Sequence, residues 1–296
     1  MRVFVTGATG FVGSAVVQEL RAAGHQVLGL ARSEAAAGRL AAAGAAVLQG
    51  SLEDPGSLQQ GAQLSDAVIH AAFNHDFTRF ADNCVLDQQA IRALGQALQG
   101  SDRPLIVTAG LARLAPGRLA VEADAQEADP AYPRVSEATA LQLVQDGVKA
   151  MVLRLPPSVH GPGDQGFVPM LIGIARDKGM SVYGGDGQHL WPAVHRLDAA
   201  RLFRLALEQG TAGERFHAAA EQGVAFKDIA TAIGRGLGLP VVAMSPEEAE
   251  AHFGWFAMFA AMDARASSAH TRSRLGWTPL EPGLIDDIEQ AGYFQS

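Results

Sequence analysis

The chain has 296 residues, of which 48% are hydrophobic and 18% charged, and its formal charge is −8. The apolar fraction excludes an intrinsically disordered chain, and the single cysteine, Cys84, excludes a disulfide framework. The acidic balance, with no stretch that concentrates Lys and Arg, argues against a nucleic-acid partner. The longest apolar run, 253–262, is shorter than the ~20 residues that span a bilayer, and a strand follows Met1-Arg2 with no space for a signal peptide. We therefore expect a cytoplasmic α/β protein without a membrane segment.

Strands and helices alternate through the first half of the chain. Apolar runs predict strands over 3–6, 26–31, 45–49, 67–70, 105–108 and 150–155. Helical spacing of apolar residues predicts helices after Val12 and over 34–43, 84–98 and 136–144. Strands that alternate with crossover helices form a parallel sheet that is covered on both faces. The fold class that we predict is therefore α/β, a Rossmann-type doubly wound parallel sheet.

The second half of the chain has a different composition. Pro and Gly are frequent over 156–169, and after a helix over 198–207 and a strand over 215–218 no regular alternation follows. We expect residues 1–160 to form a dinucleotide-binding domain that 190–218 rejoin, and 161–296 to form mainly a smaller substrate-binding lobe. The apolar residues 255–262 predict a buried helix; the alternatives are a wall of the substrate pocket or a dimer contact.

A glycine-rich turn connects the first strand to the first helix. Gly7, Gly10 and Gly13 recur every three residues within a complete strand–helix–strand unit. A pyrophosphate needs close approach to the backbone and free N–H groups at a helix N-terminus, and this spacing provides both. The residues that we expect to contact the cofactor phosphates are Gly7, Thr9, Gly10, Phe11, Val12 and Gly13.

The glycine spacing resembles that of the short-chain dehydrogenase/reductase superfamily, in particular the extended or atypical branch grouped with NAD-dependent epimerases and dehydratases. Residues 66–72 resemble the fourth-strand motif of this family, and 154–162 resemble its Arg-Pro-x-x-Val-Tyr-Gly-Pro segment, with His160 in place of tyrosine. Residues 275–279 resemble its closing motif. The resemblance implies a nicotinamide dinucleotide cofactor and a homodimer. It also implies cofactor contacts from Ala71, Ala72, Pro156 and Ser158.

The end of the second strand bears on the choice between NAD and NADP. NAD-selective enzymes place an acidic residue there, against the ribose 2′-hydroxyl. Here the sequence has Arg32 and Ser33, a cation and a hydroxyl suited to a 2′-phosphate. We therefore predict NADP, with NAD less favoured. In the alternative interpretation, Arg32 is an ordinary surface arginine whose field Glu34 weakens.

The catalytic residues of the resembling family are only partly present. Carbonyl reduction needs a proton donor, and in the family this is a tyrosine with a lysine four residues later and a Ser or Thr at the end of the fifth strand. Tyr132 is the one tyrosine in the required interval, but Ser136 follows it by four residues and the lysine is absent. Another register aligns Ser136-Glu137 with Ser-Lys and places Pro133 at the tyrosine position, and one further step brings Arg134 towards the substrate. Thr108 is the only hydroxyl at the end of the fifth strand.

Other side chains are candidates for the same cleft. His75 or Asp76 follows the fourth strand, and a histidine with a pKa of about 6.5 suits proton transfer, although His75 could instead cap the next helix. His160 replaces a pocket-lining tyrosine, and Arg79 and Arg113 could bind an anionic substrate. The nine histidines lack the spacing of metal ligands, so we predict no metal site.

Three hypotheses about function follow from these residues. The first is an NADP-dependent oxidoreductase that acts on a small-molecule substrate, a bulky ketone, aldehyde or alcohol, with an atypical catalytic set. The second is a non-catalytic NADP(H)-binding or redox-sensing protein, which the missing lysine favours. The third is a nucleotide-sugar epimerase or dehydratase, which the absent Tyr-Lys pair and the apolar run 253–262 disfavour. Because a complete second lobe is present, we favour the first hypothesis.

Overall fold

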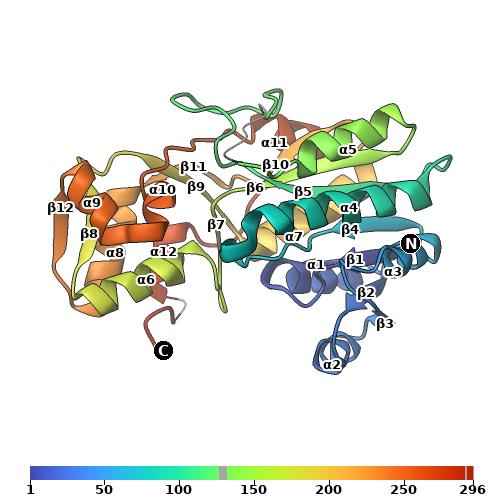
Figure 1. The fold of residues 1–296 in the computed structure, drawn as a ribbon, viewed down its shortest axis with the longest axis horizontal. Helices are drawn as coiled ribbons and strands as arrows, with labels where there is room; N and C mark the ends of the chain where they lie inside the picture. The colour runs from blue at the N-terminus through green and yellow to red at the C-terminus, as the bar shows by residue number, and fades with distance from the viewer. Residues whose placement is uncertain (127–131, 291, 296) are drawn as a thin grey trace.

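A seven-stranded parallel sheet forms the larger part of the molecule (Figure 1). The computed structural model describes residues 1–126, 132–290 and 292–295. The strand order is β3-β2-β1-β4-β5-β6-β10, so the order reverses between β1 and β4 as in doubly wound dinucleotide-binding folds. The strands are β1 (Arg2–Thr6), β2 (Gln26–Ala31), β3 (Ala46–Gln49), β4 (Ala67–His70), β5 (Leu105–Gly110), β6 (Ala150–Leu155) and β10 (Arg215–His217). The predicted fold class is confirmed.

Helices cover both faces of this sheet, because its central strands are apolar on both sides. One apolar core lies between the sheet and α1 (Phe11–Ala22), α2 (Glu34–Ala42) and α7 (Arg196–Gln209). A second core lies on the opposite face, against α3 (Pro55–Gln63), α4 (Phe80–Leu98) and α5 (Ser136–Gln145). The carboxyl ends of β1, β4 and β5 therefore meet at one edge, where a ligand site is expected.

A smaller lobe with its own apolar core packs beside the carboxyl edge of the large sheet (Figure 1). Its strands form a three-stranded and a two-stranded sheet: β7 (Ser158–His160), β9 (Leu190–His195) and β11 (Glu221–Ala225), then β8 (Ser181–Gly184) and β12 (Val241–Met244). Its helices are α6 (Phe167–Lys178), α8 (Phe226–Leu237), α9 (Pro246–Phe253), α10 (Ala257–Ala260) and α12 (Leu284–Gln290).

The chain crosses between the two lobes several times. Within 190–218, β9 lies in the small sheet, whereas α7 and β10 belong to the large domain, where β10 pairs with β6. After the small lobe, α11 (Ala269–Leu275) returns to the large domain, and Leu275 and Trp277 are buried in its first core. The Trp277 indole donates to the carbonyl of Asp198 in α7 over 3.0 Å. The large domain is therefore built from three separate parts of the sequence.

The apolar residues 255–262 do not form the single buried helix that their composition predicts. The helix α9 ends at Phe253, a short 3₁₀ turn (Gly254–Phe256) follows, and α10 has only four residues. The side chains of Phe253 and Phe256 are buried, while those of Trp255 and Met258 are 62% and 55% exposed. The break at Gly254, which has φ +56°, turns part of the run outward. Within the described residues, no helix is both long and apolar enough to cross a membrane.

Candidate active site

The glycine turn after β1 is packed too closely for larger residues. Gly7 has φ +68°, and a Cβ atom there would lie 2.7 Å from the backbone nitrogen of Ala72. A Cβ atom on Gly13 would lie 2.0 Å from the carbonyl oxygen of Gly7. The turn therefore rests against α1 on one side and against the segment after β4 on the other, which brings Ala71 and Ala72 to the same edge. These contacts explain two of the three glycines by sterics alone.

The N-terminus of α1 is left open by the same turn. Gly10 is the N-cap residue, and no side chain caps the helix. Its first turn contains no acidic residue, so no carboxylate of that turn competes for the N–H groups and the positive end of the helix dipole. This cradle fits the pyrophosphate of a nicotinamide dinucleotide, and Thr9, Phe11 and Val12 lie beside Gly10 to hold it.

Arg32 directly follows β2, at the place where a dinucleotide would put its adenosine ribose. Arg32 is exposed, and the Ser33 hydroxyl caps α2 by accepting from the N–H of Ala36 over 3.2 Å. The pKa of Glu53 is held below its usual value by a bond from Ser51, by its own backbone and by the charges of Arg32 and Arg79. Glu53 is therefore within the field of both arginines, and the Arg79 guanidinium is itself paired with Asp82 over 3.3 Å.

A pocket opens at the carboxyl end of β5, next to the switch point of the sheet. The residues that line it are Ala109, Gly110, Gln126, Tyr132, Arg134 and Ser136. Tyr132 lies in the segment before α5, with its ring 5.4 Å from that of Phe80. The guanidinium of Arg113 lies 5.9 Å from the centre of the tyrosine ring. Burial raises the pKa of the Tyr132 phenol, while the charges of Arg134 and Arg113 act in the opposite direction.

Arg134 is held in this pocket by three neighbours. Its Nε donates to the Ser136 hydroxyl over 3.0 Å, and a terminal nitrogen donates to the carbonyl of Thr108 over 3.3 Å. Its guanidinium carbon lies 4.1 Å from the centre of the Phe73 ring, a cation–π contact. The guanidinium therefore has a defined position between β4, β5 and the start of α5.

A buried chain of polar groups continues from Ser136 towards β1. The Ser136 hydroxyl donates to Asp87 in α4 over 2.5 Å, and the other oxygen of Asp87 lies 3.1 Å from His70 Nε2. His70 Nδ1 lies 2.8 Å from the Thr6 hydroxyl. Burial alone would raise the pKa of Asp87, but the bonds from His70 and Ser136 and the charges of His70 and Arg134 bring it below its usual value.

The predicted proton donors other than Tyr132 have different surroundings. The Thr108 hydroxyl donates to the carbonyl of His70 over 2.8 Å, which joins β5 to β4. His75 lies with its ring 5.3 Å from that of Phe73, and removal from water, together with the charge of Arg134, lowers its pKa. Asp76, not His75, caps the short turn that follows, by accepting from the N–H of Thr78 over 3.0 Å.

Glu137, at the position that one sequence register gives to the family lysine, is turned away from the pocket. Its carboxylate accepts from Arg154 Nε over 2.7 Å, and both side chains are buried. Pro133 lies outside the helix, because α5 begins at Ser136. The register that aligns Ser136-Glu137 with Ser-Lys thus puts an anion of the protein interior where the family has a cation.

His160 and Ser158 lie in β7, between the large sheet and the small lobe. His160 Nδ1 lies 2.8 Å from a carboxylate oxygen of Asp287 in α12, and the ring is 5.5 Å from that of His195. Both the Ser158 hydroxyl and His160 Nε2 are buried without a hydrogen-bond partner among the described residues. His160 therefore joins β7 to α12 within the small lobe, and Pro156, directly after β6, is buried.

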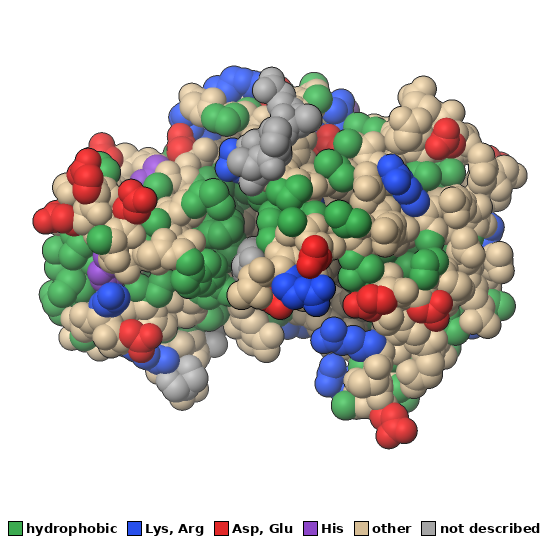
Figure 2. All heavy atoms as spheres, viewed as in Figure 1, with side chains coloured by type: hydrophobic (Ala, Val, Ile, Leu, Met, Phe, Trp, Pro, Cys, Tyr) green, Lys and Arg blue, Asp and Glu red, His purple; other side chains and the backbone are tan. Residues whose placement is uncertain are grey.

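The outer wall of the cleft is apolar. Figure 2 shows hydrophobic side chains gathered on both sides of the hollow between the two lobes. Arg113, whose guanidinium faces Tyr132, also reaches the sulfur of Met258 at 3.8 Å. This contact places the exposed part of the run 253–262 at the opening of the Tyr132 pocket, in line with the predicted alternative of a pocket wall.

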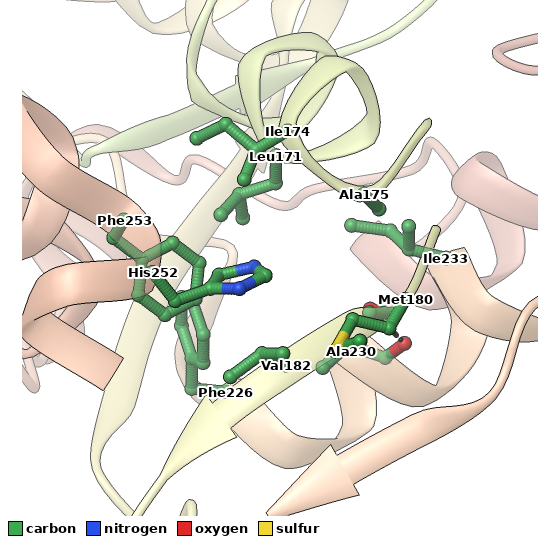
Figure 3. A pocket seen from close by; sticks show the side chains of 11 residues that line it. Leu171, Ile174, Ala175, Met180, Val182, Phe226, Ala230, Ile233, His252 and Phe253 are labelled. Atoms are coloured by element: carbon green, nitrogen blue, oxygen red, sulfur yellow. Dashed lines mark hydrogen bonds between the residues drawn. The ribbon is translucent and has the colours of Figure 1, made fainter. Parts of the chain in front are cut away.

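A second pocket lies inside the small lobe, between α6, β8, α8 and α9 (Figure 3). Aliphatic and aromatic side chains line most of it, and the imidazole of His252 points into the space among them (Figure 3). Burial lowers the pKa of His252, and the charge of Lys178 adds to this effect. Within the described residues, no group of three or more His, Cys, Asp or Glu side chains could hold a metal ion. The Tyr132 pocket, beside the phosphate cradle, is therefore the candidate active site.

Comparisons with known proteins show what the chain is similar to. A family model described as NAD dependent epimerase/dehydratase family matches residues 3–86. The chain is 48% identical to an uncharacterized protein of Schizosaccharomyces pombe over 99% of this chain and 100% of that protein. It is 31% identical, over 72% of this chain and 66% of the relative, to 4-hydroxy-2-methyl-3-oxo-4-farnesyl-3,4-dihydroquinoline-1-oxide ketoreductase of Stigmatella aurantiaca.

A solved structure shows the same fold. The dTDP-glucose 4,6-dehydratase DesIV of Streptomyces venezuelae, with NAD bound, has a TM-score of 0.80 at 19% identity and covers 100% of this chain and 97% of its own. The chain belongs to the NAD-dependent epimerase/dehydratase family. The predicted family is confirmed.

Proposed function

We propose that this chain is an NADP(H)-dependent oxidoreductase that interconverts a bulky, apolar ketone or aldehyde and the corresponding alcohol. The observation that carries the proposal is that Tyr132 lines a pocket at the carboxyl end of β5, beside the phosphate cradle of α1. The dinucleotide, when bound, supplies the hydride that forms the new C–H bond at the carbonyl carbon. The phenol of Tyr132 gives its proton to the carbonyl oxygen, and the phenolate then takes a proton from water.

Two features support the finer parts of the proposal. The cation Arg32 directly after β2, with no acidic residue at the strand end itself, favours the 2′-phosphate of NADP over the hydroxyl of NAD. The exposed Met258, which contacts Arg113 beside the Tyr132 pocket, favours an apolar substrate over a nucleotide sugar. The ketoreductase relative acts, by its name, on a farnesylated quinoline oxide, and this supports the same substrate class.

Location and assembly are further parts of the proposal. A cytoplasmic location is supported by the composition, and by a single cysteine that is free and buried. A homodimer is supported by the family resemblance, which makes the helices beside the sheet the expected contact. Both are tested directly, the first by microscopy of a tagged chain and the second by sedimentation.

The experiment for the activity combines the purified protein with NADPH or NADH and a panel of ketones of increasing apolar bulk. Wild type should oxidise NADPH in a ketone-dependent manner, and Tyr132→Phe should lower kcat by roughly 10²-fold or more, since proton donation contributes about that much. Dinucleotide affinity should be unchanged. Tyr183→Phe, in β8 of the small lobe, serves as the matched control and should retain full activity.

Two outcomes would overturn the proposal. Tight dinucleotide binding without turnover on any ketone or alcohol of the panel would instead support a redox-sensing role. Wild-type turnover in Tyr132→Phe would remove the donor role from Tyr132. In that case His75→Ala would be the next variant, because His75 lies beside Phe73 at the same edge of the sheet.

A further inference from the structure

The pocket contains a tyrosine without the lysine that stabilises its phenolate in the resembling family. With Tyr132 as the donor, the position four residues later holds Ser136. Glu137, which the other register aligns with the lysine, is an anion paired with Arg154 inside the protein. A buried phenol without a cation nearby is a poor acid, because burial raises its pKa. The site therefore needs a positive charge from somewhere else in the chain.

We propose that Arg134 supplies this charge, as a positioning residue that fixes Tyr132 and stabilises its phenolate, and that Ser136 and Asp87 hold Arg134 in place. The inference rests on the proposed function of Tyr132 as proton donor. Arg134 lines the same pocket as Tyr132, two residues further along the chain. An arginine keeps its charge at any working pH, so it can act without titrating itself.

The buried polar chain explains why Arg134 stays in the pocket. The Ser136 hydroxyl accepts from Arg134 and donates to Asp87, so its proton and its lone pair are both in use. The Asp87 carboxylate balances the charge of Arg134 from within α4, with His70 bonded to its other oxygen. This arrangement keeps a cation in a partly buried site, where an unpaired charge would be costly.

The other titratable groups around the phenol do not replace Arg134. Cys84 of α4 is buried, which raises the pKa of its thiol to about 11 and leaves it neutral. His75, after β4, has a lowered pKa, so its imidazole is neutral at any pH above that pKa. Arg113, from the loop after β5, faces the tyrosine ring at 5.9 Å and also contacts Met258, on the substrate side. Arg134 is the cation that the protein interior holds by a hydrogen-bonded chain.

The test compares Arg134→Gln, Arg134→Lys and Ser136→Ala with wild type, and Arg113→Gln removes an equal charge from the same cleft as the matched control. We expect kcat to fall roughly 10- to 100-fold in Arg134→Gln, with recovery of much of the loss in Arg134→Lys and an intermediate loss in Ser136→Ala. Arg113→Gln should change kcat less than Arg134→Gln. Substrate KM should change little in Arg134→Gln, since the side chain acts through Tyr132.

A second readout needs no cofactor or substrate. The chain has three tyrosines, so ultraviolet difference titration of wild type against Tyr132→Phe isolates the phenol of Tyr132. In Arg134→Gln this phenol should titrate at a higher pH than in wild type, and the alkaline limb of the pH profile of kcat should move the same way. Arg134→Lys should restore the wild-type titration.

The outcomes separate this inference from the proposed function. Full activity in Tyr132→Phe overturns both. An inactive Tyr132→Phe together with an Arg134→Gln variant of wild-type kcat and unchanged phenol titration overturns the role of Arg134 alone. Thermal melting shows whether Arg134→Gln folds. If it does not, the same titration is carried out on Arg134→Lys and Ser136→Ala. A Tyr132 phenol that titrates at the wild-type pH in Ser136→Ala, together with an unchanged kcat, rejects the proposed anchoring.

Discussion

The carboxylate of Glu137 and the guanidinium of Arg154 form a two-point ion pair inside the protein, with Arg154 Nε 2.7 Å from one carboxylate oxygen. Arg154 is fully buried and also contacts His217 Nε2 at 2.8 Å and the carbonyl of Asp124 at 2.6 Å. The pair joins α5 to β6 directly behind the candidate active site. One sequence register aligns Glu137 with the family lysine. Because Glu137 is the counter-charge of the buried Arg154, a lysine here would leave Arg154 without its partner.

Removing the anion of this pair should destabilise the fold. Glu137→Gln should lower the free energy of unfolding by about 3–5 kcal/mol, because Arg154 would remain buried without its counter-charge, and Glu137→Lys should cost more. Asp82→Asn, which breaks the exposed pair of Arg79 and Asp82, is the control and should change stability by less than about 1 kcal/mol. Urea denaturation measures all three. A stable, active Glu137→Lys would contradict the structural role given to this pair.

His217 should make the protein sensitive to moderate acid. Burial, together with the charge of Arg154, lowers the pKa of His217 from 6.5 to about 4, so the folded chain holds it neutral. The unfolded chain therefore binds an extra proton between these values, and stability should fall as the pH drops from about 6.5 towards 4, by up to about 3 kcal/mol. Urea unfolding across this range should show a flatter dependence in His217→Gln than in wild type. Equal slopes of the free energy of unfolding against pH in wild type and His217→Gln would contradict this role of His217.

The choice of cofactor should depend on Arg32. Arg32→Ala should weaken NADPH binding by roughly 10- to 100-fold, the size of a lost charge-assisted hydrogen bond, and change NADH binding by about twofold or less. Arg39→Ala, an exposed change in the same α2 helix, is the matched control. Fluorescence titration of the purified protein gives the four dissociation constants. Equal weakening of NADPH and NADH would refute the contact with the 2′-phosphate.

The phosphate turn should not tolerate a single added methyl group at Gly13. Its Cβ would lie 2.0 Å from the carbonyl oxygen of Gly7, so Gly13→Ala must move the turn and should abolish measurable dinucleotide binding. Gly38→Ala is the opposite case, since Gly38 lies within α2 and nothing lies within 4 Å of its Cβ position. Gly38→Ala should keep the dinucleotide affinity of wild type, and its free energy of unfolding should rise by about 0.5–1 kcal/mol. Retained binding in Gly13→Ala would show that the turn does not hold the cofactor.

Met258 should select substrates by apolar bulk. The side chain is 55% exposed at the mouth of the cleft, so Met258→Ser should raise KM for the bulkiest ketones by roughly 3- to 10-fold and leave small ketones unaffected. Leu280→Ser, at an exposed position near Asp198, is the control and should change neither the KM for bulky ketones nor the KM for small ketones. Equal effects on bulky and small ketones would argue against a substrate-facing Met258.

The fold could be predicted from the sequence because strand and helix periods are local. Several strands match their predicted ranges closely, such as β2, β4 and β6, and the glycine spacing placed the phosphate turn correctly in its strand–helix unit. The helix α4 was also predicted, and its buried residues include Ala90 as well as the polar Asn83 and Asp87. The buried face runs through Asp87, Ile91, Leu94 and Leu98, as 3.6 residues per turn require. Asp87 was missed, although a carboxylate within an apolar stripe was the available signal.

The polar contacts of the site could be predicted much less well. Arg134 and Tyr132 lie in a segment without regular structure, where no period determines which side chain faces the pocket. Their positions depend on Phe73 and Ser136, and through Ser136 on a carboxylate from another helix. The pairing of Glu137 with Arg154 likewise joins elements whose contact depends on the completed sheet. Such partners are set by tertiary packing, which a pattern along the chain does not record.

The late return of the chain to its first domain has a consequence for biosynthesis. The edge strand β10 and the indole of Trp277 complete a core whose other parts come from the first strands and helices. A nascent chain that has emerged only as far as α5 must keep apolar surface open on that face until more than 100 further residues have been made. Products that end before Trp277 are therefore expected to expose this apolar surface and to aggregate.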